Sequence, residues 1–99
     1  MLNIGKSLED LTLTVTLEGR LDTTTASQLE EELRDSLPNV TKLVLDMSKL
    51  EYISSAGLRV LLSAQKTMSR KGGMKVTHVN DIVKEVFDVT GFSDILTIE

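Results

Sequence analysis

The sequence predicts a single α/β domain whose sheet is mixed but mainly parallel. Stretches of alternating or continuous apolar residues are separated by three helical patterns, in the order β-β-α-β-α-β-α-β. Strands that alternate with helices in this way are usually joined by right-handed βαβ crossovers, which make the joined strands parallel. The 99 residues suffice for one compact domain, and they show no linker, repeat or low-complexity segment. We therefore expect one domain spanning residues 1–99.

Composition and charge narrow the possible functions. The chain has no cysteine, which excludes a disulfide, a thiol nucleophile and a thiolate metal site. Its net charge of −4 argues against binding to nucleic acid. No apolar run approaches the ~20 residues that a membrane span needs. The segment Met1–Lys6 lacks a leader pattern, so we expect the mature chain to start there and the protein to be cytoplasmic, without a membrane partner.

The first two predicted strands form a hairpin. From Leu11 to Glu18, leucine or valine alternates with threonine or glutamate, which is the pattern of a strand with one buried face. Leu11 is expected on that buried face. Met1–Ile4 predicts a short edge strand, joined to the alternating strand through a turn within Gly5–Asp10.

A helix is predicted next. Asp22–Thr25 offers several candidate N-caps, with Gln28 or Glu30 placed for a capping box. Ala26, Leu29, Leu33 and Leu37 follow at helical spacing, and Pro38 ends the pattern. The acidic run Glu30–Glu32 is interpreted as the solvated face of this helix rather than as a binding surface.

The centre of the chain predicts a strand, a junction and a second helix. Val40–Asp46 is a strand, and its continuous run Leu43–Val44–Leu45 predicts burial on both faces. A helix from about Ala56 to Lys71 buries four side chains, those of Val60, Leu61, Ala64 and Met68. Gly57, unfavourable in a helix, indicates the close approach of another group.

The remaining elements are a strand, a helix and a short final strand. Met74–Val79 alternates as a strand, and Asn80 or Asp81 caps the helix after it. The buried side of this helix is predicted to carry Ile82, Val83, Val86 and Phe87. Thr90–Gly91 closes the helix, Phe92 docks, and Ile95–Ile98 forms the last strand or an extended tail.

Two serines lie where the central strand meets the second helix. A helix start exposes unpaired N–H groups and the positive end of the helix dipole. Ser54 or Ser55 can therefore cap the helix, and the same position suits an anion. The sequence leaves open which serine performs which task.

Catalytic and metal-binding patterns are weak. His78 is the only histidine and falls in a predicted strand, where a structural role is the more common one. Asp22, Asp46 and Glu51 follow strands, yet nothing in the sequence pairs them. We expect no enzyme activity, no metal and no cofactor.

Three segments together resemble a known family. Gly19–Asp22 reads Gly-Arg-Leu-Asp, Leu43–Ser48 reads Leu-Val-Leu-Asp-Met-Ser, and Tyr52–Leu58 reads Tyr-Ile-Ser-Ser-Ala-Gly-Leu. In this order and spacing they are similar to motifs of the STAS family, which contains the anti-sigma factor antagonists and a domain of sulphate transporters. Val89–Phe92 also resembles the closing helix end of that family, so the likeness covers nearly the whole chain.

The resemblance implies a partner-switching protein. The unphosphorylated antagonist binds an anti-sigma factor that is also a serine kinase, phosphorylation releases it, and a metal-dependent serine phosphatase of the PP2C type resets it. Aligned on Gly57, the phosphate acceptor is Ser55, and Ser54 stands where the family usually has Asp. Arg59, four residues after Ser55, is placed to pair with the phosphate. The expected partner-binding residues are Asp22, Thr23, Thr24, Tyr52, Ile53, Ser54, Ser55, Ala56, Gly57, Leu58 and Arg59.

Two alternatives stay open from the sequence. One alternative is a constitutive STAS subunit or scaffold that is never phosphorylated, for example beside a lipid or solute transport ATPase. A sensor module that binds a small molecule or nucleotide at the strand ends is the other alternative.

Overall fold

The computed structural model describes all residues from Met1 to Glu99 and follows the predicted element order. The strands and helices are β1 (Leu2–Glu9), β2 (Thr12–Leu21), α1 (Ala26–Ser36), β3 (Lys42–Ile53), α2 (Ser55–Met68), β4 (Met74–Thr77), α3 (Asp81–Thr90) and β5 (Thr97–Ile98). Two short 3₁₀ helices lie at Leu37–Asn39 and Phe92–Asp94. The sheet order is β1-β2-β3-β4-β5, with β1 antiparallel to β2 and all other pairs parallel. The predicted α/β fold with a mixed, mainly parallel sheet is confirmed.

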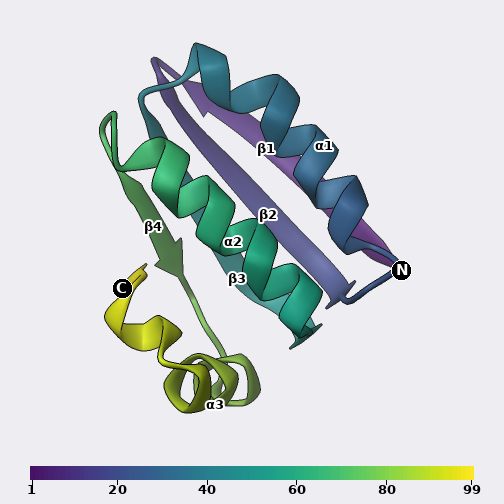
Figure 1. Ribbon diagram of the computed structural model, residues 1–99. Coiled ribbons are helices and arrows are strands. Elements are labelled where there is room, and N and C mark those ends of the chain that lie inside the picture. The colour runs from purple at the N-terminus through teal and green to yellow at the C-terminus, as the bar shows by residue number, and fades with distance from the viewer.

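The two longer helices cover a single face of the sheet. Figure 1 shows α1 and α2 side by side across it. The strands are ordered as they occur in the sequence, so each right-handed crossover moves in the same direction and lays its helix on the same face. On the other face Val44 is only half-buried, as are the threonines of β2 beside it. The prediction that Leu43–Val44–Leu45 is buried on both faces is therefore wrong for Val44, because no helix packs there.

The core is aliphatic and continuous. Twenty-five buried apolar residues form one cluster beneath α1, α2 and α3. Phe87, on α3, is its only aromatic member and is fully buried. The predicted buried residues of α1 and α2 all belong to this cluster. The sheet and its helices thus form one packed unit that fixes the loops at its ends.

Strand β3 is longer than its sequence pattern predicts. It continues past Asp46 to Ile53, and its buried residues there are Met47, Leu50 and Ile53, every third residue rather than every second. Two register shifts against β2 each add an extra residue to β3. Such bulges break the two-residue alternation and increase the local twist. The predicted strand end at Asp46 is wrong for this reason.

The N-terminal hairpin also differs from the prediction. β1 runs to Glu9 rather than Ile4, and the turn lies at Asp10–Leu11, where Asp10 has a positive φ of 56°. Leu11 is therefore in the turn and exposed, not on the buried face. A tight turn allows the two strands to pair along their whole length, and that pairing sets the edge strand's length.

Two predictions about the C-terminal third are corrected. β4 ends at Thr77, because His78 takes a left-handed φ of 57° and leaves the strand. Ile82 is 65% exposed, since α3 turns only Val83 and Phe87 fully toward the core. Asn80 caps α3 as predicted and accepts the Val83 N–H at 2.9 Å.

Candidate functional site

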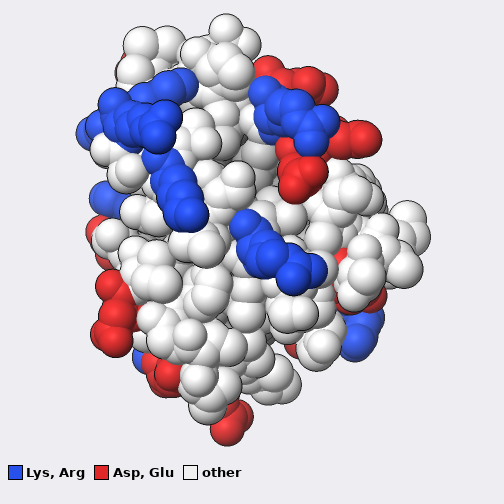
Figure 2. Space-filling model, viewed as in Figure 1, with Lys and Arg blue, Asp and Glu red and all other residues white.

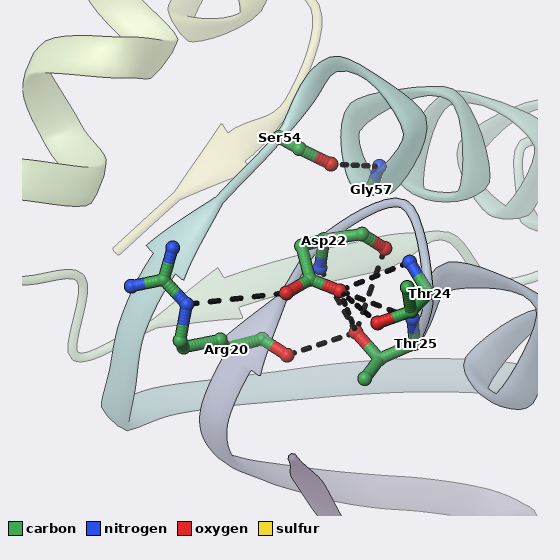
Figure 3. Close-up of polar contacts among 6 residues, drawn as sticks. All are labelled: Arg20, Asp22, Thr24, Thr25, Ser54 and Gly57. Atoms are coloured by element: carbon green, nitrogen blue, oxygen red, sulfur yellow. Dashed lines mark hydrogen bonds and ion pairs between the residues drawn. The ribbon is translucent and has the colours of Figure 1, made fainter.

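The candidate site begins with a rigid turn after β2. An Asp22 carboxylate oxygen accepts the Thr24 N–H at 3.0 Å, the Thr24 hydroxyl at 2.8 Å and the Thr25 N–H at 3.2 Å (Figure 3). The buried Thr25 hydroxyl donates to the Arg20 carbonyl at 2.8 Å and accepts the Asp22 N–H at 2.9 Å. The Thr24 hydroxyl, followed by the backbone N–H groups, lowers the pKa of Asp22 below its ordinary value. The turn therefore holds a fixed negative charge.

Helix α1 begins at Ala26 as predicted, but the contacts that precede it differ from the predicted capping. Thr25 occupies the N-cap position but makes no side-chain cap, because its hydroxyl is committed to Arg20. Gln28 donates its side-chain amide to the Leu2 carbonyl at 3.1 Å, and Glu30 pairs with Arg34. Neither Gln28 nor Glu30 forms the predicted capping box. The threonines instead lock the turn against β2.

The carboxyl ends of the parallel strands β2 and β3 lie side by side, which brings the Asp22–Thr25 turn close to the Ser54–Ser55 junction. Because of the second bulge, Arg20 lies opposite Tyr52 and Leu21 opposite Ile53. The Arg20 guanidinium lies over the Tyr52 ring, 4.4 Å from its centroid, and its Nε is 3.9 Å from an Asp22 oxygen. The Ser54 N–H donates to the Leu21 carbonyl at 2.9 Å. The two segments expected to share an interface thus lie at one end of the sheet.

The serines divide their tasks. Ser54 is the N-cap of α2, and its hydroxyl accepts the Gly57 N–H at 3.3 Å (Figure 3). Ser55 is the first helical residue, is exposed, and its hydroxyl makes no hydrogen bond within the chain. A cap must precede the helix with extended backbone, and Ser54, with ψ of 175°, meets that requirement. The capping role that the sequence left open between the two serines therefore belongs to Ser54.

Gly57 lets α2 approach the ends of the strands. A Cβ on Gly57 would lie 2.7 Å from Leu21 Cγ and 3.0 Å from Ile53 Cγ1, both side chains being buried. The close approach expected at this glycine is to core side chains. Ile53, Gly57 and Leu58 are all buried, so they support the site from beneath.

The solvent side of the site is formed by the remaining predicted residues. Thr23, Thr24, Tyr52, Ser55 and Arg59 are exposed, and Asp22, Ser54 and Ala56 are partly so. Thr23, Ala56 and Arg59 also line a hollow of about 390 Å³ between the starts of α1 and α2. Sequence reasoning missed the stacking of Arg20 on Tyr52, because their pairing depends on the bulges in β3.

Asp22 and Asp46, two of the three carboxylates considered for chemistry, make local contacts. An Asp46 oxygen accepts the Ser48 N–H at 2.9 Å and lies 3.5 Å from His78 Nδ1, and the Ser48 N–H is the main reason that the pKa of Asp46 is lowered. No three His, Cys, Asp or Glu side chains gather in a metal-binding arrangement. None of the three helices is both long enough and apolar enough to cross a bilayer.

Comparison with known proteins defines the class. The family model described as "Mlab, STAS domain" matches residues 4–97, so the chain belongs to the STAS domain family. BtrV of Bordetella bronchiseptica, named as an anti-sigma factor antagonist, is 37% identical over 84 residues, covering 83% of this chain and 72% of that protein. The anti-sigma F factor antagonist of Paenibacillus polymyxa is 32% identical over 89 residues, covering 87% and 76%. The resemblance found in the sequence is confirmed.

Solved structures agree on the fold. An anti-sigma factor antagonist from Mycobacterium paratuberculosis superposes with a TM-score of 0.90 at 21% identity, covering 99% of this chain and 85% of that one. Unphosphorylated SpoIIAA, also an anti-sigma factor antagonist, superposes with a TM-score of 0.82 at 17% identity, covering 100% and 88%. At these identities the superpositions establish the shared fold.

Proposed function

We propose that this chain is an anti-sigma factor antagonist that is controlled by phosphorylation of Ser55. The observation that carries the proposal is the state of that serine: it is exposed, unbonded and placed at the positive end of α2, while Ser54 supplies the cap. The names of the relatives support the antagonist role. The partner is an anti-sigma factor with serine kinase activity, and a PP2C-type phosphatase removes the phosphate.

Physical chemistry suggests how phosphate would act. A phosphoserine carries about −1.5 to −2 charges, and a helix N-terminus stabilises such an anion, so the fold need not change. Arg59 lies one helical turn from Ser55 and has no ion-pair partner, which leaves it free to bind the phosphate. Release then follows from repulsion and bulk within the interface.

A constitutive STAS subunit is the second candidate. The observation in its favour is Ser54, which replaces the Asp that usually precedes the acceptor serine in the family. On this alternative, Ser55 would only be a contact residue, and a charge placed there would not control release. The small-molecule sensor receives less support, because the strand order never reverses and so creates no switch-point crevice of the kind where α/β sheets bind nucleotides.

The test uses two baits, Ser55→Ala and Ser55→Asp, in pull-downs from the cells that express the protein, with mass spectrometry of the retained proteins. We expect the Ala bait to retain an anti-sigma factor with a kinase domain and the Asp bait to lose it. Ser7→Asp is the matched control. Ser7 is exposed on β1, so this substitution adds the same charge away from the site. Equal retention by both Ser55 baits would favour the constitutive subunit.

A further inference from the structure

Helix α2 carries a row of cations on its solvent side. Arg59, Lys66 and Arg70 are the cations concerned, and the seven residues between Arg59 and Lys66 place these two on the same face of the helix, two turns apart. Arg70 lies just after the C-cap Ser69, and all three residues are exposed. At the rise of a helix, Arg59 and Lys66 are about 10 Å apart along α2, and Arg70 extends the row past the end of the helix. We call these three residues the α2 cation row.

The cation row is not neutralised by the rest of the chain. None of its three members takes part in an ion pair. All fifteen acidic residues lie outside the segment Tyr52–Asn80, although the protein as a whole is acidic. Figure 2 shows blue groups along the diagonal that α2 follows in Figure 1, with no red group among them. An unbalanced positive surface on an acidic protein suits a negatively charged partner.

A groove with an apolar floor runs beside the row. It lies between α1 and α2, has a volume of about 450 Å³, and is lined by Leu33, Leu37, Val60 and Ala64 among others. Lys71 closes one end, where its Nζ donates to the Leu37 carbonyl at 2.6 Å and the Val40 carbonyl at 3.1 Å. The opposite wall, α1, carries Glu30 and Arg34, which form an ion pair with each other at 3.0 Å. The cation row lies on α2 beside the groove and not in it, so a ligand that covers both would place its acidic side on the row and apolar side chains on the floor.

The length of the α2 cation row favours one kind of partner. A row of two helical turns, extended by Arg70 past the helix end, matches one short acidic helix. An extended polyanion or a flat anionic membrane would leave the apolar floor of the groove uncovered, and the net charge of −4 would repel either one. We propose that the groove and the α2 cation row bind an acidic amphipathic helix of a protein partner. This inference rests on the proposed function for the identity of that partner, the anti-sigma factor, but its chemistry is testable alone.

The test is a titration of the whole chain with a synthetic 15-residue amphipathic helix that has glutamates on one face and leucines on the other. Binding is followed by calorimetry and by backbone amide shifts. We expect the shifts to fall on α2 and the facing side of α1. Changing the row to glutamine (R59Q, K66Q and R70Q together) should weaken binding by about tenfold, from the sum of three exposed charge contacts. Added salt should weaken the wild-type complex.

The matched control removes three cations elsewhere. K42Q, K49Q and K84Q change the net charge equally, and these lysines lie outside α2; this variant should bind within twofold of the wild type. The proposal is overturned if the two triple variants bind equally or if the peptide does not bind. Tighter binding of a 15-base-pair DNA duplex or of phosphatidylglycerol vesicles would also overturn it. Failure of the proposed function is a separate result, because only the Ser55 baits report on phosphorylation.

Discussion

At the scale of single residues, the two serines between β3 and α2 have different environments. Ser54 engages the backbone of α2, while Ser55, one residue later, is free and exposed. Serine and aspartate are both good N-caps, since each offers an oxygen to the first free N–H groups. The replacement of the family's usual Asp by Ser54 therefore keeps the cap and removes one negative charge beside Ser55.

Replacement of Ser54 by Ala should lower the free energy of unfolding by about 1 kcal/mol, because the Gly57 N–H loses its acceptor. Urea unfolding measures this change. Ser54→Asp should retain most of the stability, and Ser55→Ala should stay within about 0.5 kcal/mol of the wild type. A larger loss for Ser55→Ala than for Ser54→Ala would contradict the assignment of the cap.

The Asp22 turn should give a pH-dependent contribution to stability. The Thr24 hydroxyl and the N–H groups of Thr24 and Thr25 hold the folded pKa of Asp22 below its unfolded value. Its stabilising effect is therefore present above the unfolded pKa of about 3.9 and is lost as the pH falls through the lower, folded pKa. Carboxyl carbon NMR should find the Asp22 midpoint below that of an unstructured peptide.

The control for that titration is Thr24→Val, which removes the hydroxyl and keeps the backbone N–H. The Asp22 pKa should rise toward its ordinary value in this variant. An unchanged midpoint would show that the hydroxyl does not stabilise the carboxylate.

At the scale of elements, the helices followed from the sequence far better than the site did. The spacing of Leu29, Leu33, Val60 and Leu61 placed α1 and α2 on the core, because helix burial is periodic and local. The pairing of Arg20 with Tyr52 was not predictable, since it depends on two extra residues in β3 that show only in the register with β2. The same bulges break the two-residue alternation after Asp46, so the sequence pattern did not predict the second half of β3.

Helix α2 also depends on a glycine at its base. Gly57→Ala should improve intrinsic helix propensity by up to about 1 kcal/mol, yet the new Cβ meets Leu21 and Ile53 at 2.7 and 3.0 Å. Overpacking typically costs about 1–3 kcal/mol, so we expect net destabilisation in urea unfolding. Ser63→Ala, at an exposed position of the same helix, is the comparison and should not destabilise. A stabilised Gly57→Ala protein would mean that α2 can move away from the strand ends.

At the scale of the whole molecule, strand order explains the one-sided architecture. Because the order β1-β2-β3-β4-β5 never reverses, α1 and α2 share one face and the opposite face keeps half-buried threonines. The alternation of leucine and threonine in β2 already indicated such a face. The continuous run Leu43–Val44–Leu45 in β3 instead predicted burial on both faces. The sequence pattern alone does not distinguish a partly exposed valine, such as Val44, from a buried one.

The same architecture gathers the charged features on one side. The Asp22 turn, Ser55 and Arg59 lie at the end of the sheet where α1 and α2 begin, and the cation row continues from Arg59 along α2. A phosphate on Ser55 would lie one turn from the first member of that row. Partner binding and its control by phosphate are therefore proposed for one continuous surface.

Phosphate on Ser55 is proposed to release the partner. The most direct measurement incubates the wild-type chain with the anti-sigma factor retained by the Ser55→Ala bait, together with ATP and Mg²⁺, and follows intact mass and complex formation. We predict the gain of one phosphate, located on Ser55 by fragmentation, and loss of the complex, whereas Ser55→Ala gains none and stays bound. A phosphate located on another residue, or a phosphorylated chain that stays bound, would show that Ser55 does not control release.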